Sequence, residues 1–279
     1  MDSTLLADIG GTYLRYRVGR GEVESCDSKG WEARLMKLIE THPRIKRVGI
    51  SFAGQVFGGK IRSAPNVAVV IPDIKQELEQ RFARISVEIE NDLKCAALAY
   101  QRHLCSDSVA VLYAGSGLGS ALISEGKIVR GCENMAGEIG HISYRKAPFR
   151  CGCGKEDCLE LFASGSGIDK HRFHFHLSGG TLDEWLDQGG QEERQTALAA
   201  AEGLAWAASL MITLYNPAIL VVGGGMLEHN PFLRQRMKDA IKSRTFPPAW
   251  MGCSIVEGDL SNAPLVGAGL LFGDNFWLE

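Results

Sequence analysis

Residues 5–18 read LLADIGGTYLRYRV, in which two strand-like runs flank the turn Gly10-Gly11-Thr12, and a third run follows near residues 22–26. The same order of strand, glycine turn, strand, turn and strand recurs at residues 109–129, which begin VAVLYAGSGLGSALI. Strands joined by tight glycine turns pair as antiparallel hairpins. The repeat therefore predicts two similar lobes, each of which begins with an antiparallel meander.

Helical and strand patterns alternate after each meander. Apolar residues at helical spacing predict helices, and short apolar runs predict buried strands. In the first half these are helices at 32–40, 74–82 and 93–102 and strands at 48–52 and 87–90. In the second half they are a helix at 196–215, a strand at 218–222 and a closing helix at 266–272. The expected fold class is α/β with mixed sheets, with lobes at 1–105 and 106–263 and a C-terminal helix, about 264–279, that packs back on the first lobe.

Composition limits the class of protein. The chain has 279 residues, 45% of them hydrophobic, which is enough to bury a sizeable core. A net charge of −3 gives no basic excess for a nucleic-acid backbone. The acidic N-terminus enters structure at once, unlike a signal peptide, and the longest apolar run, 204–214, is too short to cross a bilayer. We therefore expect a soluble, cytoplasmic protein without a nucleic-acid or membrane partner.

A dense group of metal-binding side chains lies in the second half. Its members are His141, Cys151, Cys153 and Cys158. One imidazole and three thiolates form the ligand set of a closed, structural zinc site. A disulfide or a group of unbridged thiols is the alternative, but the remaining cysteines are scattered and do not resemble an extracellular disulfide framework. We expect Zn²⁺, with Glu138 and Glu160 held beside the ligands as acceptors for a polyhydroxylated molecule.

Three glycine turns follow predicted strands, where backbone amides can reach phosphate oxygens without a Cβ in the way. They contain Asp8, Gly10, Gly11 and Thr12, then Gly115, Ser116 and Gly117, and finally Gly224 and Gly225. Each turn alone is also consistent with a simple hairpin or tight turn. Together they predict a nucleotide site in which the first two turns hold phosphates and Asp8 orients a hydrated Mg²⁺. The third turn would let a base or ribose lie against bare backbone.

Glu90-Asn91-Asp92 ends a predicted strand and begins an alanine-rich helix. Asp92 is a good candidate for the helix N-cap, and capping is one interpretation of its presence. The positive end of the helix dipole also favours an ionised carboxylate, which a base that accepts a hydroxyl proton requires. Asp92 is therefore a candidate catalytic base.

These motifs occur in one order along nearly the whole chain, from Leu5 to about Gly269. The ordered set resembles the ROK family of bacterial sugar kinases and sugar-responsive repressors. It consists of Asp8-Ile9-Gly10-Gly11-Thr12, Glu90-Asn91-Asp92, Gly137-Glu138-Ile139-Gly140-His141, the cysteine cluster with Leu159-Glu160, and Val222-Gly223-Gly224-Gly225.

The resemblance implies a two-lobed, actin-like and ribonuclease-H-like fold with ATP and sugar bound in a cleft between the lobes. It implies transfer of the ATP γ-phosphate to a sugar hydroxyl, usually at C6, with Asp92 as base. The sugar-binding residues that it implies are Asn66, Asn91, Asp92, Glu138, His141 and Glu160. It also implies a homodimer, with ATP, Mg²⁺ and Zn²⁺ as cofactors.

The leading hypothesis is an ATP-dependent hexokinase, with glucose as the first substrate to try. N-acetylmannosamine, N-acetylglucosamine, fructose and allose remain open, because Ala53, Gln55 and the segment 69–72 depart from the usual family pattern near the sugar. A sugar-sensing transcriptional regulator is a second hypothesis, although only seven residues precede Asp8 and a DNA-binding helix-turn-helix needs more. A non-catalytic, zinc-stabilised carbohydrate-binding protein is the third.

Overall fold

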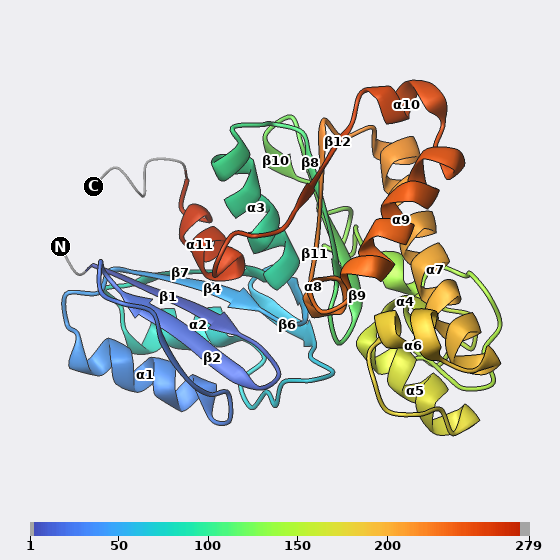
Figure 1. Cartoon of the computed structure of the whole chain (residues 1–279). Coiled ribbons are helices and arrows are strands. Elements are labelled where there is room, and N and C mark those ends of the chain that lie inside the picture. The colour runs from blue at the N-terminus through green and yellow to red at the C-terminus, as the bar shows by residue number, and fades with distance from the viewer. Residues whose placement is uncertain (1–2, 274–279) are drawn as a thin grey trace. The chain divides into compact units, whose positions relative to one another are not determined.

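The computed structural model describes residues 3–273, which divide into two compact units (Figure 1). The first unit contains the chain up to Cys105, the segment Ile128–Ala136 and the chain from Leu260. The second contains Ser106–Lys127 and Gly137–Asp259. The segment Ile128–Ala136, which the sequence assigns to the second lobe, packs with the first unit.

A five-stranded mixed sheet forms the centre of the first unit, in the order β3-β2-β1-β4-β7. β1 pairs antiparallel with β2 and parallel with β4, so the predicted meander joins directly to a parallel layer. The strands are β1 (Thr4–Ile9), β2 (Tyr13–Val18), β3 (Glu24–Asp27), β4 (Arg47–Phe52) and β7 (Ser86–Asn91), with a separate hairpin of β5 (Gln55–Phe57) and β6 (Lys60–Ser63). The helices are α1 (Trp31–Thr41), α2 (Ile74–Arg81), α3 (Asp92–Leu104) and α11 (Ala263–Leu270).

Apolar spacing explains how α1 joins the core of this unit. Trp31, Leu35 and Ile39 are four residues apart, lie on one face of the helix, and are completely buried. The Trp31 ring packs against Phe52 at the end of β4, with 5.7 Å between ring centroids. The amphipathic pattern at 32–40 thus correctly predicted the helix.

The helix α11 packs against α3, β1 and β4 within the first unit. Two glycines make this close packing possible. A Cβ at Gly267 would lie 1.7 Å from the carbonyl oxygen of Cys95 in α3, and a Cβ at Gly49 would lie 2.3 Å from the carbonyl oxygen of Ala268. The part of the predicted closing segment at 274–279 lies outside the described residues.

Replacing Gly267 with alanine is expected to lower the free energy of unfolding by about 3 kcal/mol, because α11 must move away from a rigid backbone carbonyl. Chemical denaturation measures the change. Gly179→Ala is the matched control, because a methyl group there meets no atom within 4 Å. Equal stability of the two variants would contradict the packing argument.

The second unit repeats the plan with the strand order β10-β9-β8-β11-β12. β8 pairs antiparallel with β9 and parallel with β11, as β1 does with β2 and β4. The strands are β8 (Val109–Ala114), β9 (Leu118–Ser124), β10 (Lys127–Ile128), β11 (Ile219–Gly223) and β12 (Ser254–Glu257). The helices are a 3₁₀ turn η1 (Ile139–His141), α4 (Glu160–Ala163), α5 (Gly165–Phe175), α6 (Leu182–Gln188), α7 (Gln191–Tyr215), α8 (Gly225–Glu228), α9 (Pro231–Arg244) and α10 (Pro247–Met251). The α/β class and the repeated meander are confirmed.

The long helix α7 begins five residues before its predicted start and is the main core helix of this unit. By length and composition alone it could cross a membrane, but 61% of its most apolar window is buried within the protein. It packs against α9, α6 and α4. Pro247-Pro248 begins α10, because prolines suit the first turn of a helix.

Candidate functional site

The first glycine hairpin connects β1 to β2 and is closed by a hydrogen bond from the Gly10 amide to the Tyr13 carbonyl, 2.9 Å long. Gly11 lies close to Asn66, because a Cβ there would be 3.1 Å from both the Cβ and the carbonyl oxygen of Asn66. The structure therefore places Asn66, a predicted sugar-binding residue with an exposed side chain, directly beside the predicted phosphate-binding hairpin.

Asp8 lies near the end of β1 and is 7% exposed. Its cross-strand neighbours are Ser51 on the parallel side and Arg15 on the antiparallel side. Ser51 donates a hydrogen bond of 2.7 Å to Oδ1, and Arg15 Nη1 lies 3.5 Å from Oδ2. Burial raises the pKa of Asp8, and these two partners partly oppose the shift. Sequence reasoning missed both residues, because only the strand register shows that they flank the carboxylate.

The N-cap of α3 is Asn91, so the expectation that Asp92 caps this helix is wrong. Asn91 Oδ1 accepts hydrogen bonds from the amides of Leu93 and Lys94, at 3.1 and 3.2 Å. Its Nδ2 donates to Asp92 Oδ1 at 2.9 Å and to the Gly54 carbonyl at 3.1 Å. Asn91 has the extended backbone that an N-cap needs, and Asp92 is the first helical residue. One predicted sugar ligand therefore orients the candidate base.

The Asp92 carboxyl is half-buried and accepts a second hydrogen bond from the Leu93 amide, 2.9 Å long. Burial is the main cause that raises the pKa of Asp92 to about 7, and the negative charge of Asp8 adds to it. A base with a pKa near 7 is half ionised at neutral pH and still accepts a proton strongly. The raised pKa differs from the expectation that the helix dipole favours an ionised carboxylate, because burial outweighs the hydrogen bonds at the start of α3.

The second glycine turn, Gly115-Ser116-Gly117, connects β8 to β9 and is held from two sides. The Gly165 and Ser166 amides at the start of α5 donate to the carbonyls of Gly115 and Ser116, at 2.8 and 3.0 Å. On the other side, Glu160 Oε2 accepts a hydrogen bond of 3.1 Å from the Leu118 amide. The structure thus brings together Glu160 and the turn, which the sequence treats as parts of different sites.

His141, Cys151, Cys153 and Cys158 converge, and their ligand atoms all lie within 4.8 Å of one another. Cys153 Sγ lies 3.3 Å from Cys158 Sγ, and Cys151 Sγ lies 3.6 Å from His141 Nδ1. Backbone pairing of Ser143 with Cys158 fixes the histidine segment against the cysteine loop. All eight cysteines are free, so the alternative of a disulfide finds no support within the described residues. Four soft ligands at these separations fit a tetrahedral Zn²⁺ site.

The 3₁₀ turn η1 places the other two predicted sugar ligands of this unit. A Cβ at Gly137 would lie 2.4 Å from the Ser120 carbonyl oxygen, and one at Gly140 would lie 2.4 Å from that of Leu118. The two glycines therefore let the segment lie directly on β9. Glu138 is exposed and His141 is half-buried.

A cavity of about 480 Å³ opens within the second unit. Its lining includes Gly115 and Ser116 of the second turn, Gly225 after β11, and Thr181 and Asn230, among others. Gly224 has φ +95°, and a Cβ there would lie 2.5 Å from the Ala114 carbonyl oxygen, so only glycine fits. The second and third predicted glycine turns therefore line one cavity, whereas the first belongs to the other unit.

Comparison with known proteins agrees with this arrangement. The N-acetylmannosamine kinase of Vibrio cholerae is 30% identical over 261 residues, which cover 86% of this chain and 90% of that protein. The N-acetyl-D-glucosamine kinase of Shigella flexneri is 28% identical over 220 residues, 72% of each chain. The crystal structure of the ROK hexokinase from Thermus thermophilus matches 96% of both chains, with a TM-score of 0.81 and 25% identity. This likeness shows the actin-like ATPase fold. Since the ROK family profile also matches residues 8–275, the chain belongs to the ROK family.

Proposed function

We propose that this protein is an ATP-dependent sugar kinase in which Asp92 is the catalytic base. The observation that carries the proposal is the Asp92 carboxyl, which the first turn of α3 holds with a pKa of about 7 in the same unit as the Asp8 hairpin. A carbohydrate-binding protein has no need for such a group. Membership of a family whose named members include sugar kinases supports the same conclusion.

The acceptor is proposed to be a hexose or an N-acetylhexosamine, with glucose and its C6 hydroxyl as the first candidate. The names of the relatives add N-acetylmannosamine and N-acetylglucosamine to the sugars to be tried. The residues proposed to hold the sugar hydroxyls are Asn66, Asn91, Asp92, Glu138, His141 and Glu160.

In the proposed reaction Asp92 orients the sugar hydroxyl and accepts its proton as the oxygen bonds to phosphorus. Bound ATP supplies the γ-phosphoryl group, and ADP leaves. Amides of the two glycine hairpins stabilise phosphate charge, and Asp8 holds Mg²⁺ through water. The cavity lined by Gly115, Ser116 and Gly225 is proposed to take the nucleoside.

The metal cluster is proposed to bind one Zn²⁺ that has a structural role. His141 would ligate it through Nδ1, the nitrogen that faces Cys151, and would keep the other ring nitrogen for the sugar. The metal would thus fix the position of His141 and of its neighbour Glu138.

A homodimer is proposed from the family resemblance alone, and light scattering of the purified protein tests it.

The decisive experiment measures phosphorylation of a small sugar panel, with ATP or polyphosphate as donor and ADP or product as readout. Sugar-phosphate formation with ATP supports the kinase. Sugar binding by calorimetry without turnover, for every sugar and both donors, would instead favour a sugar-sensing or carbohydrate-binding protein.

Replacing Gly225 with valine is expected to raise the KM for ATP at least tenfold, because the side chain enters the space proposed for the nucleoside. The backbone tolerates the change, since the nearest atom to an added Cβ is 3.6 Å away, in the His229 ring. Steady-state kinetics should show an unchanged KM for the sugar. An unchanged KM for ATP would place the nucleoside elsewhere.

A further inference from the structure

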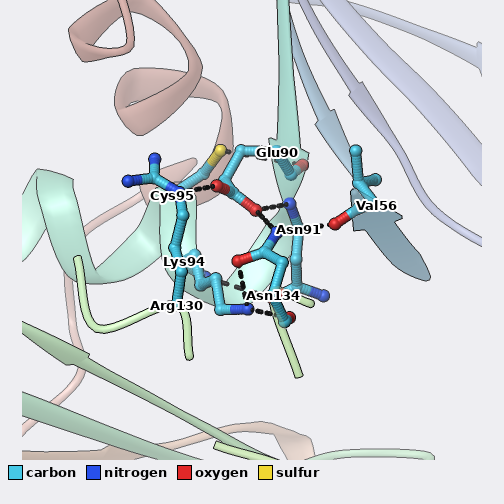
Figure 2. A network of polar contacts seen from close by, with 7 residues as sticks. All are labelled: Val56, Glu90, Asn91, Lys94, Cys95, Arg130 and Asn134. Atoms are coloured by element: carbon cyan, nitrogen blue, oxygen red, sulfur yellow. Dashed lines mark hydrogen bonds and ion pairs between the residues drawn. The ribbon is translucent and has the colours of Figure 1, made fainter. Parts of the chain in front are cut away.

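Two buried charged side chains flank Asp92 in the sequence. Glu90 at the end of β7 and Lys94 in the first turn of α3 are each 3% exposed. Burying a charge costs free energy unless other groups replace its contacts with water. Figure 2 shows that both side chains reach the same residue, Asn134.

Asn134 is held through both ends of its side chain. Its Nδ2 donates to Glu90 Oε1 at 2.7 Å and to the Val56 carbonyl at 2.6 Å. Its Oδ1 and its backbone carbonyl accept from Lys94 Nζ at 2.8 and 2.5 Å. It is the only buried residue of the segment Ile128–Ala136. Asn134 therefore joins β5, β7 and α3 at one point.

A chain of hydrogen bonds leads from Asn134 to the candidate base. Glu90 Oε1, which accepts from Asn134, also accepts from the Asn91 amide at 2.9 Å, and Glu90 Oε2 pairs with Arg130 at 2.8 Å. The Asn91 side chain then donates to Asp92 Oδ1 (Figure 2 shows the part from Asn134 to Asn91). On the other side of Asp92, Lys94 fixes the first turn of α3 to the same amide.

We propose that Asn134 is a positioning residue for phosphoryl transfer and that Glu90 transmits its effect to Asp92. The inference rests on the proposed function of Asp92. Apolar side chains of similar volume would fill this space without the cost of burying two charges, whereas a fully satisfied polar network fixes one orientation of the groups it joins. The orientation fixed here is that of the junction between β7 and α3, where the base lies.

The first test is Asn134→Gly, which removes the amide and keeps a backbone at φ +62° that glycine adopts freely. Asn216→Gly is the matched control, because Asn216 is exposed and has φ +44°. Asn134→Gly is expected to lower kcat at least tenfold per ATP-binding site, with the KM for ATP within twofold of wild type. The control should leave both constants unchanged. A merely structural role would reduce the fraction of binding-competent protein but not kcat per site.

The second test compares two replacements of Glu90. Glutamine keeps an acceptor for both the Asn91 and Asn134 N–H groups, whereas leucine removes it. Glu90→Gln is therefore expected to stay within threefold of the wild-type kcat, and Glu90→Leu is expected to lose at least tenfold. Equal kcat values for the two variants, or full kcat in Asn134→Gly, would overturn the proposal.

The crystal structure of Asn134→Gly gives a readout that does not depend on activity. The proposal expects the contact between Asn91 Nδ2 and Asp92 Oδ1, 2.9 Å long in the wild type, to be broken or lengthened. An unchanged contact would overturn the positioning role even if the enzyme were active. If the wild type turned over none of the sugars, the proposed function would fail. The effect of Asn134→Gly on the contact between Asn91 and Asp92 would still be tested by the crystal structure.

Discussion

Replacing Asp92 with asparagine is expected to lower kcat by about a thousandfold, because the amide cannot accept the hydroxyl proton. Sugar and ATP should still bind, since the substitution keeps the size of the side chain and an oxygen for the Leu93 amide. Coupled kinetics and calorimetry separate the two effects. Asp27→Asn, which changes an exposed carboxylate of the same unit, is the control and should leave kcat unchanged.

The dependence of kcat/KM on pH tests the role of Asp92 independently. Because the proton acceptor must be ionised, kcat/KM for the sugar should rise with pH through the pKa of Asp92, about 7, and level off above it. The acid limb should be missing from the residual activity of Asp92→Asn. A wild-type profile that is flat from pH 5 to pH 9 would be inconsistent with Asp92 as the base.

The stability of the folded protein should fall as pH rises, whereas kcat/KM rises. The folded protein raises the pKa of Asp92 from 3.8 to about 7, so between these values it binds more protons than the unfolded chain. Its stability therefore falls as pH rises through this range, and the loss is complete above pH 7. Asp92→Asn should accordingly be more stable than wild type at pH 8, with the difference vanishing below about pH 4. Thermal unfolding at the two pH values measures this.

Replacing Cys158 with serine is expected to remove the bound zinc and to reduce kcat/KM for the sugar at least a hundredfold. Cys158 is fully buried and contacts Cys153, so the loss of one thiolate opens the cluster and releases the start of α4, where Glu160 lies. Metal analysis should fall from one zinc per chain to none, and Tm should drop.

Cys105→Ser, which changes an exposed thiol outside the cluster, serves as the control for Cys158→Ser. It should keep both zinc and activity. Wild-type protein that retains its Tm and its sugar affinity after complete chelation of zinc would contradict a structural metal.

Much of the fold could be predicted because its signals are local. Glycine turns between apolar runs specified both meanders, and the amphipathic pattern at 32–40 predicted α1. The helix α9 was not predicted, although its buried residues Leu233, Met237 and Ile241 are spaced four residues apart, as in α1. The helix α8 and the strand β12 are four residues long, too short to show a period, so long-range packing decides their structure. Pro247-Pro248 fits either a turn or a helix start, and only the tertiary context selects α10.

The residue types of the candidate site could be predicted from the sequence, but the contacts between residues far apart in the sequence could not. Residue type and order pointed to the Asp8 hairpin, to Asp92 and to the cluster around Cys158. The register that places Ser51 beside Asp8 could not be read, because strand pairing joins residues far apart in the sequence. Nothing in the sequence marks Asn134 as buried either, since a single polar residue in an irregular segment is typical of a solvent-exposed loop.

The close seating of α11 on β4 and α3, at Gly49 and Gly267, has a consequence for biosynthesis. The sheet of the first unit, which contains β1, receives this cover from residues 263–270, far later in the chain. Until those residues are synthesised, a nascent chain exposes the face of β4 on which the backbone of Gly49 is bare. The first unit is therefore completed only after residues 106–127 and 137–259 of the second unit have been synthesised.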